Sequence, residues 1–128
     1  MIYLDTSVAL AQLLAEDRQP PEELWAETIV SSRLLEYELW NAIHRHGLMA
    51  SHAEAARQLL EALAFAELSR ETLRRALEPF PVPVRTLEAL HLASVLFLRD
   101  QGLELELASY DGRMIEAATA LGIPLAEC

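Results

Sequence analysis

Acidic side chains at four separated positions are the residues of this sequence best suited to chemistry. They are Asp5, Glu38, Glu88 and Asp111. Carboxylates that cluster repel one another, and divalent cations that prefer oxygen ligands relieve this repulsion. Mg²⁺ takes few protein carboxylates and keeps water and substrate phosphates as its other ligands. Because such an ion can activate water and stabilise the leaving oxygen of a phosphodiester, the four acids predict a metal-dependent hydrolytic site.

The two aspartates each stand between an expected strand and an expected helix. Residues 1–4 form an apolar run, and residues 103–107 alternate leucine with glutamate, a period of two that favours a strand. In an open parallel sheet, ligands bind beyond the carboxyl ends of the strands, where Asp5 and Asp111 would lie. Each aspartate alone could be only a helix N-cap, but their equivalent positions favour a shared site.

The two glutamates lie on expected helices. Between residues 33 and 46 an apolar stripe faces the core and places Glu38 on a neighbouring stripe, with a solvated ion pair as the alternative. Glu36 is a rival that periodicity does not exclude. Glu88 lies in the first turn of a helix that Thr86 is expected to cap, where the helix dipole alone favours a carboxylate. Because this helix is apolar nearly all round, a carboxylate at its tip requires a partner or a pocket.

The histidines do not predict a zinc site. His44 and His46 are two residues apart on an expected helix and therefore face different directions. His91, one turn after Glu88, is more typical of a core histidine than of a ligand. The sequence also contains no Ser-His-Asp arrangement, no glycine-rich phosphate loop and no Cys-X-X-Cys motif.

Alternating strands and helices are expected to position the acids. The strands are expected at residues 1–4, 29–30, 103–107 and 123–125, and the helices at residues 8–15, 33–46, 51–65, 70–77, 86–100 and 111–122. Ser51 and Glu54 predict a capping box for the third helix, and Gly47 predicts the end of the second. Strands separated by helices imply parallel pairing through right-handed crossovers. The expected fold class is therefore α/β, a three-layer α/β/α fold with a short central parallel sheet, and residues 1–128 are expected to form one domain.

The composition favours a soluble enzyme over a general nucleic-acid binder. A formal charge of −10 lacks the basic footprint of such binders, although it is compatible with an acidic cluster that a metal neutralises. The absence of lysine excludes a phosphotransfer receiver module, which needs one beside its phosphoryl group.

The single cysteine, Cys128, suits a reducing cytosol. The most apolar stretch, residues 90–98, is too short to span a bilayer, and the first residues lack a signal-peptide pattern. We therefore expect a cytoplasmic protein with no membrane segment.

Large aromatic side chains predict an interaction surface. Trp25, Tyr37 and Trp40 are bulky for a domain of this size, so some of them are expected near the surface. The helix face around Trp40 and the helix at residues 51–65 are candidates for contact with a second copy or a partner, with core packing as the alternative.

Four stretches of the chain together carry a family resemblance. They are IYLDTS at residues 2–7, SSRLLEYEL at 31–39, VRTLEALHLA at 84–93 and ASYDGR at 108–113. In this order they resemble the PIN-domain ribonucleases, specifically VapC-type toxins of type II toxin–antitoxin modules. The resemblance covers essentially the whole chain and implies the PIN-like fold.

The resemblance implies roles for individual residues. All four acids match the catalytic, metal-binding acids of the family, and Glu38 rather than Glu36 matches the second of them. Glu88 falls where the family usually has aspartate, so its extra methylene moves the carboxylate. Ser109 matches a small hydroxyl residue that supports the site, and Thr6 is expected to support it beside the first aspartate.

The resemblance also implies chemistry and partners. Members of the family use Mg²⁺ or Mn²⁺ to hydrolyse RNA phosphodiesters with a metal-activated water. They pair as homodimers and are silenced by a cognate antitoxin protein. Four arginines near the acid motifs are candidates to contact RNA phosphate, with surface or ion-pair duty as the alternative: Arg33, Arg45, Arg85 and Arg113. Two other functions stay open, namely a catalytically weak PIN-like protein that binds RNA or a partner, and a PIN nuclease of RNA processing outside a toxin module.

Overall fold

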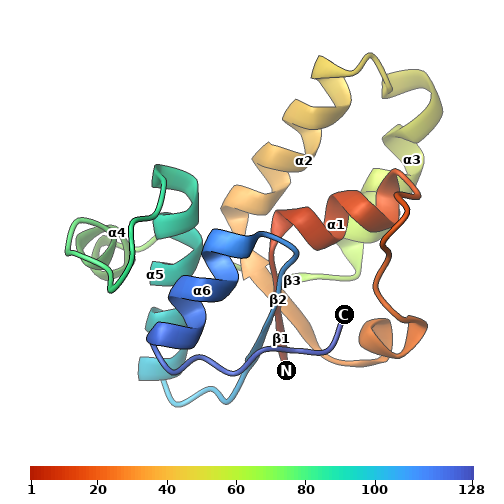
Figure 1. Ribbon diagram of the computed structural model, residues 1–128. Helices are drawn as coiled ribbons and strands as arrows, with labels where there is room; N and C mark the ends of the chain where they lie inside the picture. The colour runs from red at the N-terminus through yellow and green to blue at the C-terminus, as the bar shows by residue number, and fades with distance from the viewer.

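A sheet of four parallel strands lies at the centre of the structure, a computed structural model that describes residues 1–128 (Figure 1). The strands are β1 (Ile2–Leu4), β2 (Ile29–Ser32), β3 (Ala64–Ala66) and β4 (Glu106–Ala108). Their order is β3-β2-β1-β4, so β1 is central, and Tyr3 lies between Val30 of β2 and Leu107 of β4. The predicted last strand is reduced to an isolated parallel bridge between Leu107 and Leu125. The expected α/β class with a short parallel sheet is confirmed.

Helices cover both faces of this sheet. The α-helices are α1 (Thr6–Leu13), α2 (Arg33–Arg45), α3 (Met49–Glu61), α4 (Arg70–Ala76), α5 (Thr86–Asp100) and α6 (Gly112–Ala120), and a 3₁₀ turn, η1, spans Glu22–Ala26. Helices α1, α2 and α3 pack on one face, α5 and α6 pack on the other, and α4 packs against α5 (Figure 1). Gly47, at a φ of +66°, follows the end of α2 as the sequence predicts. No helix has both the length and the apolar composition that crossing a membrane requires.

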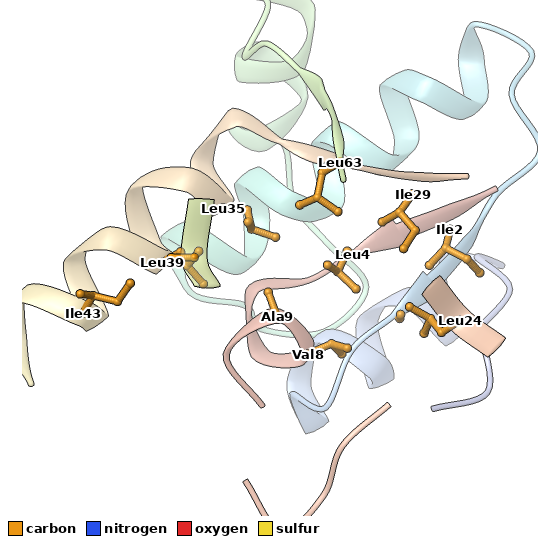
Figure 2. Packing of buried hydrophobic residues seen from close by; sticks show 12 residues of the cluster. Ile2, Leu4, Val8, Ala9, Leu24, Ile29, Leu35, Leu39, Ile43 and Leu63 are labelled. Atoms are coloured by element: carbon orange, nitrogen blue, oxygen red, sulfur yellow. The ribbon is translucent and has the colours of Figure 1, made fainter. Parts of the chain in front are cut away.

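Alternation along the strands divides the core in two. Ile2 and Leu4 point toward α1, α2 and α3, where they pack with apolar side chains of those helices (Figure 2). Tyr3 points to the opposite face and packs with α5 and α6. Tyr3 is completely buried, so its hydroxyl must find a hydrogen-bond partner inside the protein.

The segment from residue 49 to residue 66 departs from the sequence prediction. The predicted capping box at Ser51 and Glu54 is wrong, because α3 begins at Met49 and Ser51 donates its hydroxyl hydrogen to the carbonyl of Leu48. The predicted extension of the helix to Phe65 is also wrong, because residues 64–66 form β3. This strand pairs with β2, and that tertiary pairing overrides the helix propensity of its two alanines.

Smaller shifts occur where strands join helices. The helix α1 begins directly after Asp5 rather than near Val8, and Thr86 is the first residue of α5, whose N-cap is Arg85. The alternation at residues 103–107 becomes regular strand only from Glu106. Boundary shifts of one or two residues change little, but the starts of α1 and α5 lie immediately beside the candidate site residues Asp5 and Arg85.

Candidate active site

One pocket brings the four predicted acids together at the carboxyl ends of β1 and β4. It has a volume of about 530 Å³ and includes all four carboxylate residues in its lining. The acids come from different elements: two are the N-caps of α1 and α6, one lies on α2 and one on α5. The pocket also contains hydroxyl groups, a histidine and two arginines. The sequence prediction of one shared acidic site therefore agrees with the placement of these side chains.

Asp5 is held by two serine hydroxyls. Its Oδ2 accepts hydrogen bonds from the hydroxyls of Ser7 at 2.5 Å and Ser109 at 2.9 Å. Each serine oxygen in turn accepts a backbone N–H from the loop between β4 and α6, at Tyr110 and Asp111 respectively. Asp5 Oδ1 has no hydrogen-bond partner within the protein. Asp5 is only 5% exposed, so this network fixes a nearly buried carboxylate with one oxygen unengaged.

Asp111 combines helix capping with a place in the pocket. Its Oδ1 accepts the backbone N–H groups of Arg113 at 2.9 Å and Met114 at 3.2 Å, which satisfies two of the unpaired donors at the start of α6. Its Oδ2 makes no hydrogen bond with the protein. The capping alternative and the site assignment are therefore compatible, because each function uses a different oxygen.

Glu38, rather than Glu36, is the glutamate of α2 that lines the pocket. Its Oε1 accepts the hydroxyl of Thr6 at 2.9 Å and faces His91 Nε2 at 2.6 Å. Its Oε2 has no partner within the protein. Glu36 forms an ion pair with Arg33 at 2.8 Å outside the pocket. Glu38 thus lies on the side of α2 that faces Thr6 of α1 and His91 of α5, a contact that periodicity alone does not reveal.

Glu88 differs from the other three acids because both of its oxygens are engaged. Oε1 accepts Arg113 Nε at 3.0 Å, and Oε2 accepts the backbone N–H of Arg85 at 3.0 Å. The side chain is 9% exposed, so this pair lies at the edge of the buried interior. No three acidic, histidine or cysteine side chains lie close enough together to hold one ion between them. The pocket therefore gathers four acids without forming a compact cage of ligands.

The four candidate arginines divide into two groups. Arg85 and Arg113 line the pocket, whereas Arg45 is exposed in the last turn of α2 and lies outside it. Arg33 pairs with Glu67 and Glu36, and hydrogen bonds to these carboxylates raise the pKa of its guanidinium above the ordinary value. Of the four arginines, only Arg85 and Arg113 are therefore placed to contact a substrate bound at the acids.

Three residues of the site were missed by the sequence analysis. Ser7 holds Asp5, and Tyr3 and His91 form a buried pair in which the Tyr3 hydroxyl lies 2.8 Å from His91 Nδ1. Burial raises the pKa of Tyr3 far above its ordinary value, so its hydroxyl keeps its hydrogen. The available signal was spacing: Tyr3 precedes Asp5 by two residues, and His91 follows Glu88 by three, one helical turn.

Comparison with known proteins identifies the family to which this fold belongs. The family model of the PIN domain matches residues 2–120, so the chain belongs to the PIN-domain family. Ribonuclease VapC46 of Mycobacterium tuberculosis (strain H37Rv) is 32% identical over 126 residues, covering 95% of this chain and 93% of that protein. Ribonuclease VapC47 of Mycobacterium tuberculosis (strain CDC 1551 / Oshkosh) is 27% identical over 129 residues, with the same coverage. These relatives place the chain among the VapC ribonucleases of the family.

Solved structures support the fold assignment. VapC20 of Mycobacterium tuberculosis, described as a sarcin–ricin loop cleaving toxin, matches with a TM-score of 0.70 and 18% identity over the whole of both chains. A toxin–antitoxin complex from Klebsiella pneumoniae matches with a TM-score of 0.69 and 15% identity over 94% of each chain. At these identities the likeness concerns the fold, which is the one the sequence resemblance implies.

Proposed function

We propose that this chain is the toxin of a toxin–antitoxin pair, an endoribonuclease that cleaves RNA with a divalent cation held in the acidic pocket. The observation that carries the proposal is the pocket itself. Four carboxylates from four elements line it, in a chain related to VapC ribonucleases. Three of them each keep one oxygen without a protein partner: Asp5 Oδ1, Glu38 Oε2 and Asp111 Oδ2.

The donors in this pocket fit Mg²⁺ or Mn²⁺. Both are hard cations that prefer oxygen, and Mg²⁺ keeps several waters while using one or two carboxylates directly. Carboxylates that share a pocket without converging on one point suit an ion that keeps most of its waters and contacts only one or two carboxylates directly. One or two of Asp5, Glu38 and Asp111 would hold the ion directly and the rest through its waters. Ligation by Glu88 requires its pair with Arg113 to open. When bound, the ion supplies Lewis acidity for phosphodiester hydrolysis.

The protein's own residues orient the carboxylates and the RNA. Ser7 and Ser109 hold one oxygen of Asp5, which turns the other toward the pocket. Arg85 and Arg113 supply positive charge at the pocket rim, where a guanidinium can donate two hydrogen bonds to a phosphate. These local cations matter because the net charge of −10 repels RNA elsewhere on the surface.

The partners in this proposal are an RNA substrate, a cognate antitoxin and a second copy of the chain, all in the cytoplasm. Large exposed apolar side chains suit contact with such protein partners. Tyr37 of α2 is 70% exposed, as expected for one of the three aromatic residues, whereas Trp40 is partly buried and its ring lies beneath Arg57. Leu73 of α4, Leu77 directly after α4 and Leu87 of α5 are 45%, 88% and 46% exposed, and we propose this surface for the homodimer.

An Asp5→Asn variant tests the proposed function. Asparagine caps a helix about as well as aspartate, so α1 should remain folded while the charge at the site is removed. We expect wild-type protein to cleave RNA with Mn²⁺ or Mg²⁺ but not with EDTA, and the variant to be slower by about a hundredfold or more. Thermal melting should shift upward with Mn²⁺ in the wild type and less in the variant.

Glu36→Gln is the matched control, because it neutralises an acid on the outer side of α2. This variant should cleave RNA at the wild-type rate. Cleavage that persists in EDTA, or equal activity of Asp5→Asn and wild type, would contradict the proposal. RNA binding without cleavage under any metal condition would instead favour a catalytically weak PIN-like binding protein.

A further inference from the structure

A chain of buried hydrogen bonds lies behind the pocket and links β1, α5 and α2. The Tyr3 hydroxyl is 2.8 Å from His91 Nδ1, and His91 Nε2 is 2.6 Å from Glu38 Oε1. Tyr3 is fully buried, His91 is 1% exposed, and the Glu38 side chain is 23% exposed. The chain therefore begins in the core and ends on an acid that reaches the pocket.

The donors and acceptors along this chain define its direction. The Tyr3 hydroxyl oxygen accepts the backbone N–H of Ser32 at 3.2 Å and lies 2.8 Å from His91 Nδ1. A neutral imidazole that accepts at Nδ1 carries its hydrogen on Nε2. Glu38 Oε1 is a carboxylate oxygen that only accepts, so we place the ring hydrogen on His91 Nε2 and have Nδ1 accept the Tyr3 hydroxyl.

Packing alone does not account for a histidine at this position. The neighbours of His91 in α5 are apolar, and an apolar residue would fill the same space without two ring nitrogens to satisfy. A histidine that served only the core would need no contact with a residue of the pocket. Instead, its second nitrogen meets Glu38, which also accepts the hydroxyl of Thr6 on the same oxygen.

We infer that His91 is a positioning residue that, with Tyr3 behind it, fixes the Glu38 carboxylate so that Oε2 faces the pocket. The inference rests on the proposed function, in which Glu38 takes part in holding the cation. Glutamate has three side-chain torsions, and two donors on a single oxygen restrict them before an ion binds. Groups that orient a metal ligand in this way commonly change metal affinity or activity by about 10- to 100-fold when they are removed.

Two amides of different length separate orientation from simple space filling. In His91→Gln the amide nitrogen reaches about as far as Nε2 does and can still donate to Glu38. In His91→Asn the amide ends near the position of Nδ1, so it reaches Tyr3 but not Glu38. We expect Mn²⁺ affinity, measured by calorimetry, to stay within about twofold of wild type for Gln and to fall by about tenfold for Asn.

RNA cleavage by the same variants should show an effect on kcat rather than on KM. A misoriented Glu38 should lower kcat for His91→Asn and leave KM nearly unchanged, since RNA phosphates meet the arginines rather than His91. Tyr3→Phe removes the donor to Nδ1 and should lower Mn²⁺ affinity in the same direction. It serves as a second variant should His91→Asn fail to fold. Folded Asn and Phe variants with wild-type Mn²⁺ affinity and kcat would overturn the inference.

The nitrogen NMR signals of the His91 ring provide a readout that requires no activity. We expect an unprotonated Nδ1 and a protonated Nε2 in the wild type, and a displaced Nε2 signal in Glu38→Gln. A wild-type protein that neither binds Mn²⁺ nor cleaves RNA would reject the proposed function. The ring signals would then test the positioning role by themselves. A hydrogen on Nδ1 would reject that role, and so would an Nε2 signal that does not change in Glu38→Gln.

Discussion

The side chain of Glu88 illustrates how one methylene group changes the partners of an acid. At this position the family usually has an aspartate. The longer side chain of Glu88 instead accepts hydrogen bonds from Arg113 Nε and from the backbone N–H of Arg85. The pair keeps a positive charge at the pocket and removes one carboxylate from the set with free oxygens. Arg113 therefore has two effects in our proposal: it attracts RNA phosphate, and it lowers the negative charge that a cation meets.

An Arg113→Gln variant separates these two effects. Removing the guanidinium frees Glu88 Oε1, so Mn²⁺ affinity should rise by up to about fivefold, equivalent to the ~1 kcal/mol that an exposed ion pair contributes. The KM for RNA should rise at the same time, because a phosphate contact is lost. Calorimetry and steady-state cleavage measure the two quantities.

Arg57→Gln is the control for this change, since Arg57 is an exposed arginine of α3 paired with Glu54. It should alter neither Mn²⁺ affinity nor KM. If Arg113→Gln behaves like this control in both measurements, Arg113 plays no part in binding either ligand.

The candidate site could be predicted from sequence only to the level of residue types and strand ends. Asp5 directly follows its predicted strand, and Asp111 stands a few residues after the alternating strand at residues 103–107, so both positions are marked by a local signal. His91 was interpreted as a core histidine, and it is indeed buried. Its bond to Glu38 joins residues 53 positions apart, and helical periodicity carries no information about such a contact.

At the scale of elements, two strand-to-helix junctions form a single unit. The β1–α1 junction supplies Asp5 and Ser7, and the β4–α6 junction supplies Ser109 and the backbone amides that the serine oxygens accept. Each serine hydroxyl thus joins the two junctions through one donated and one accepted hydrogen bond. This arrangement holds the two aspartates in register beyond the ends of adjacent strands.

A Ser109→Ala variant should therefore loosen the whole unit. The hydroxyl is nearly buried, and its loss leaves the Asp111 N–H and Asp5 Oδ2 each without one partner. We expect the free energy of unfolding to fall by about 1–3 kcal/mol, measured by urea denaturation. Ser51→Ala, which removes an exposed hydroxyl on α3, should change it by less than about 0.5 kcal/mol. Equal stability of the two variants would show that the junctions do not depend on Ser109.

Most elements could be predicted from sequence because their signals are local. Caps such as Asp5, Asp111 and Gly47 and the apolar periodicity of α2 and α5 depend on neighbours within a few residues. The strand β3 could not be predicted in this way, because Ala64 and Ala66 favour helices in isolation. It forms because β2 offers an unpaired edge, and that edge exists only in the folded protein.

At the scale of the whole molecule, charge and apolar surface are unevenly placed. The net charge of −10 keeps copies of the chain apart in general, whereas α4 and the start of α5 present exposed leucines. Next to them lies a mostly apolar groove of about 550 Å³ between these helices, which includes Phe80 and Val84. Self-association is therefore expected at this surface in particular.

A Leu77→Glu variant tests the assembly. Leu77 is 88% exposed, so a charged side chain there should not disturb folding but should oppose an apolar interface. We expect light scattering to give a dimer for the wild type and a monomer for the variant at the same concentration. Leu103→Glu, at a 37% exposed position away from α4, should remain dimeric. A wild-type monomer at high concentration would reject the homodimer.

The central position of β1 has a consequence for the order in which a ribosome makes this chain. β1 emerges before β2 and β3, whereas its other neighbour β4 and the residue Asp111 emerge after them. The bond from Ser109 to Asp5 spans 104 positions, so a nascent chain that has not reached Ser109 lacks this bond and Asp111. We therefore expect the acidic pocket to be completed, and RNA cleavage to begin, only after β4 has been made and has joined β1.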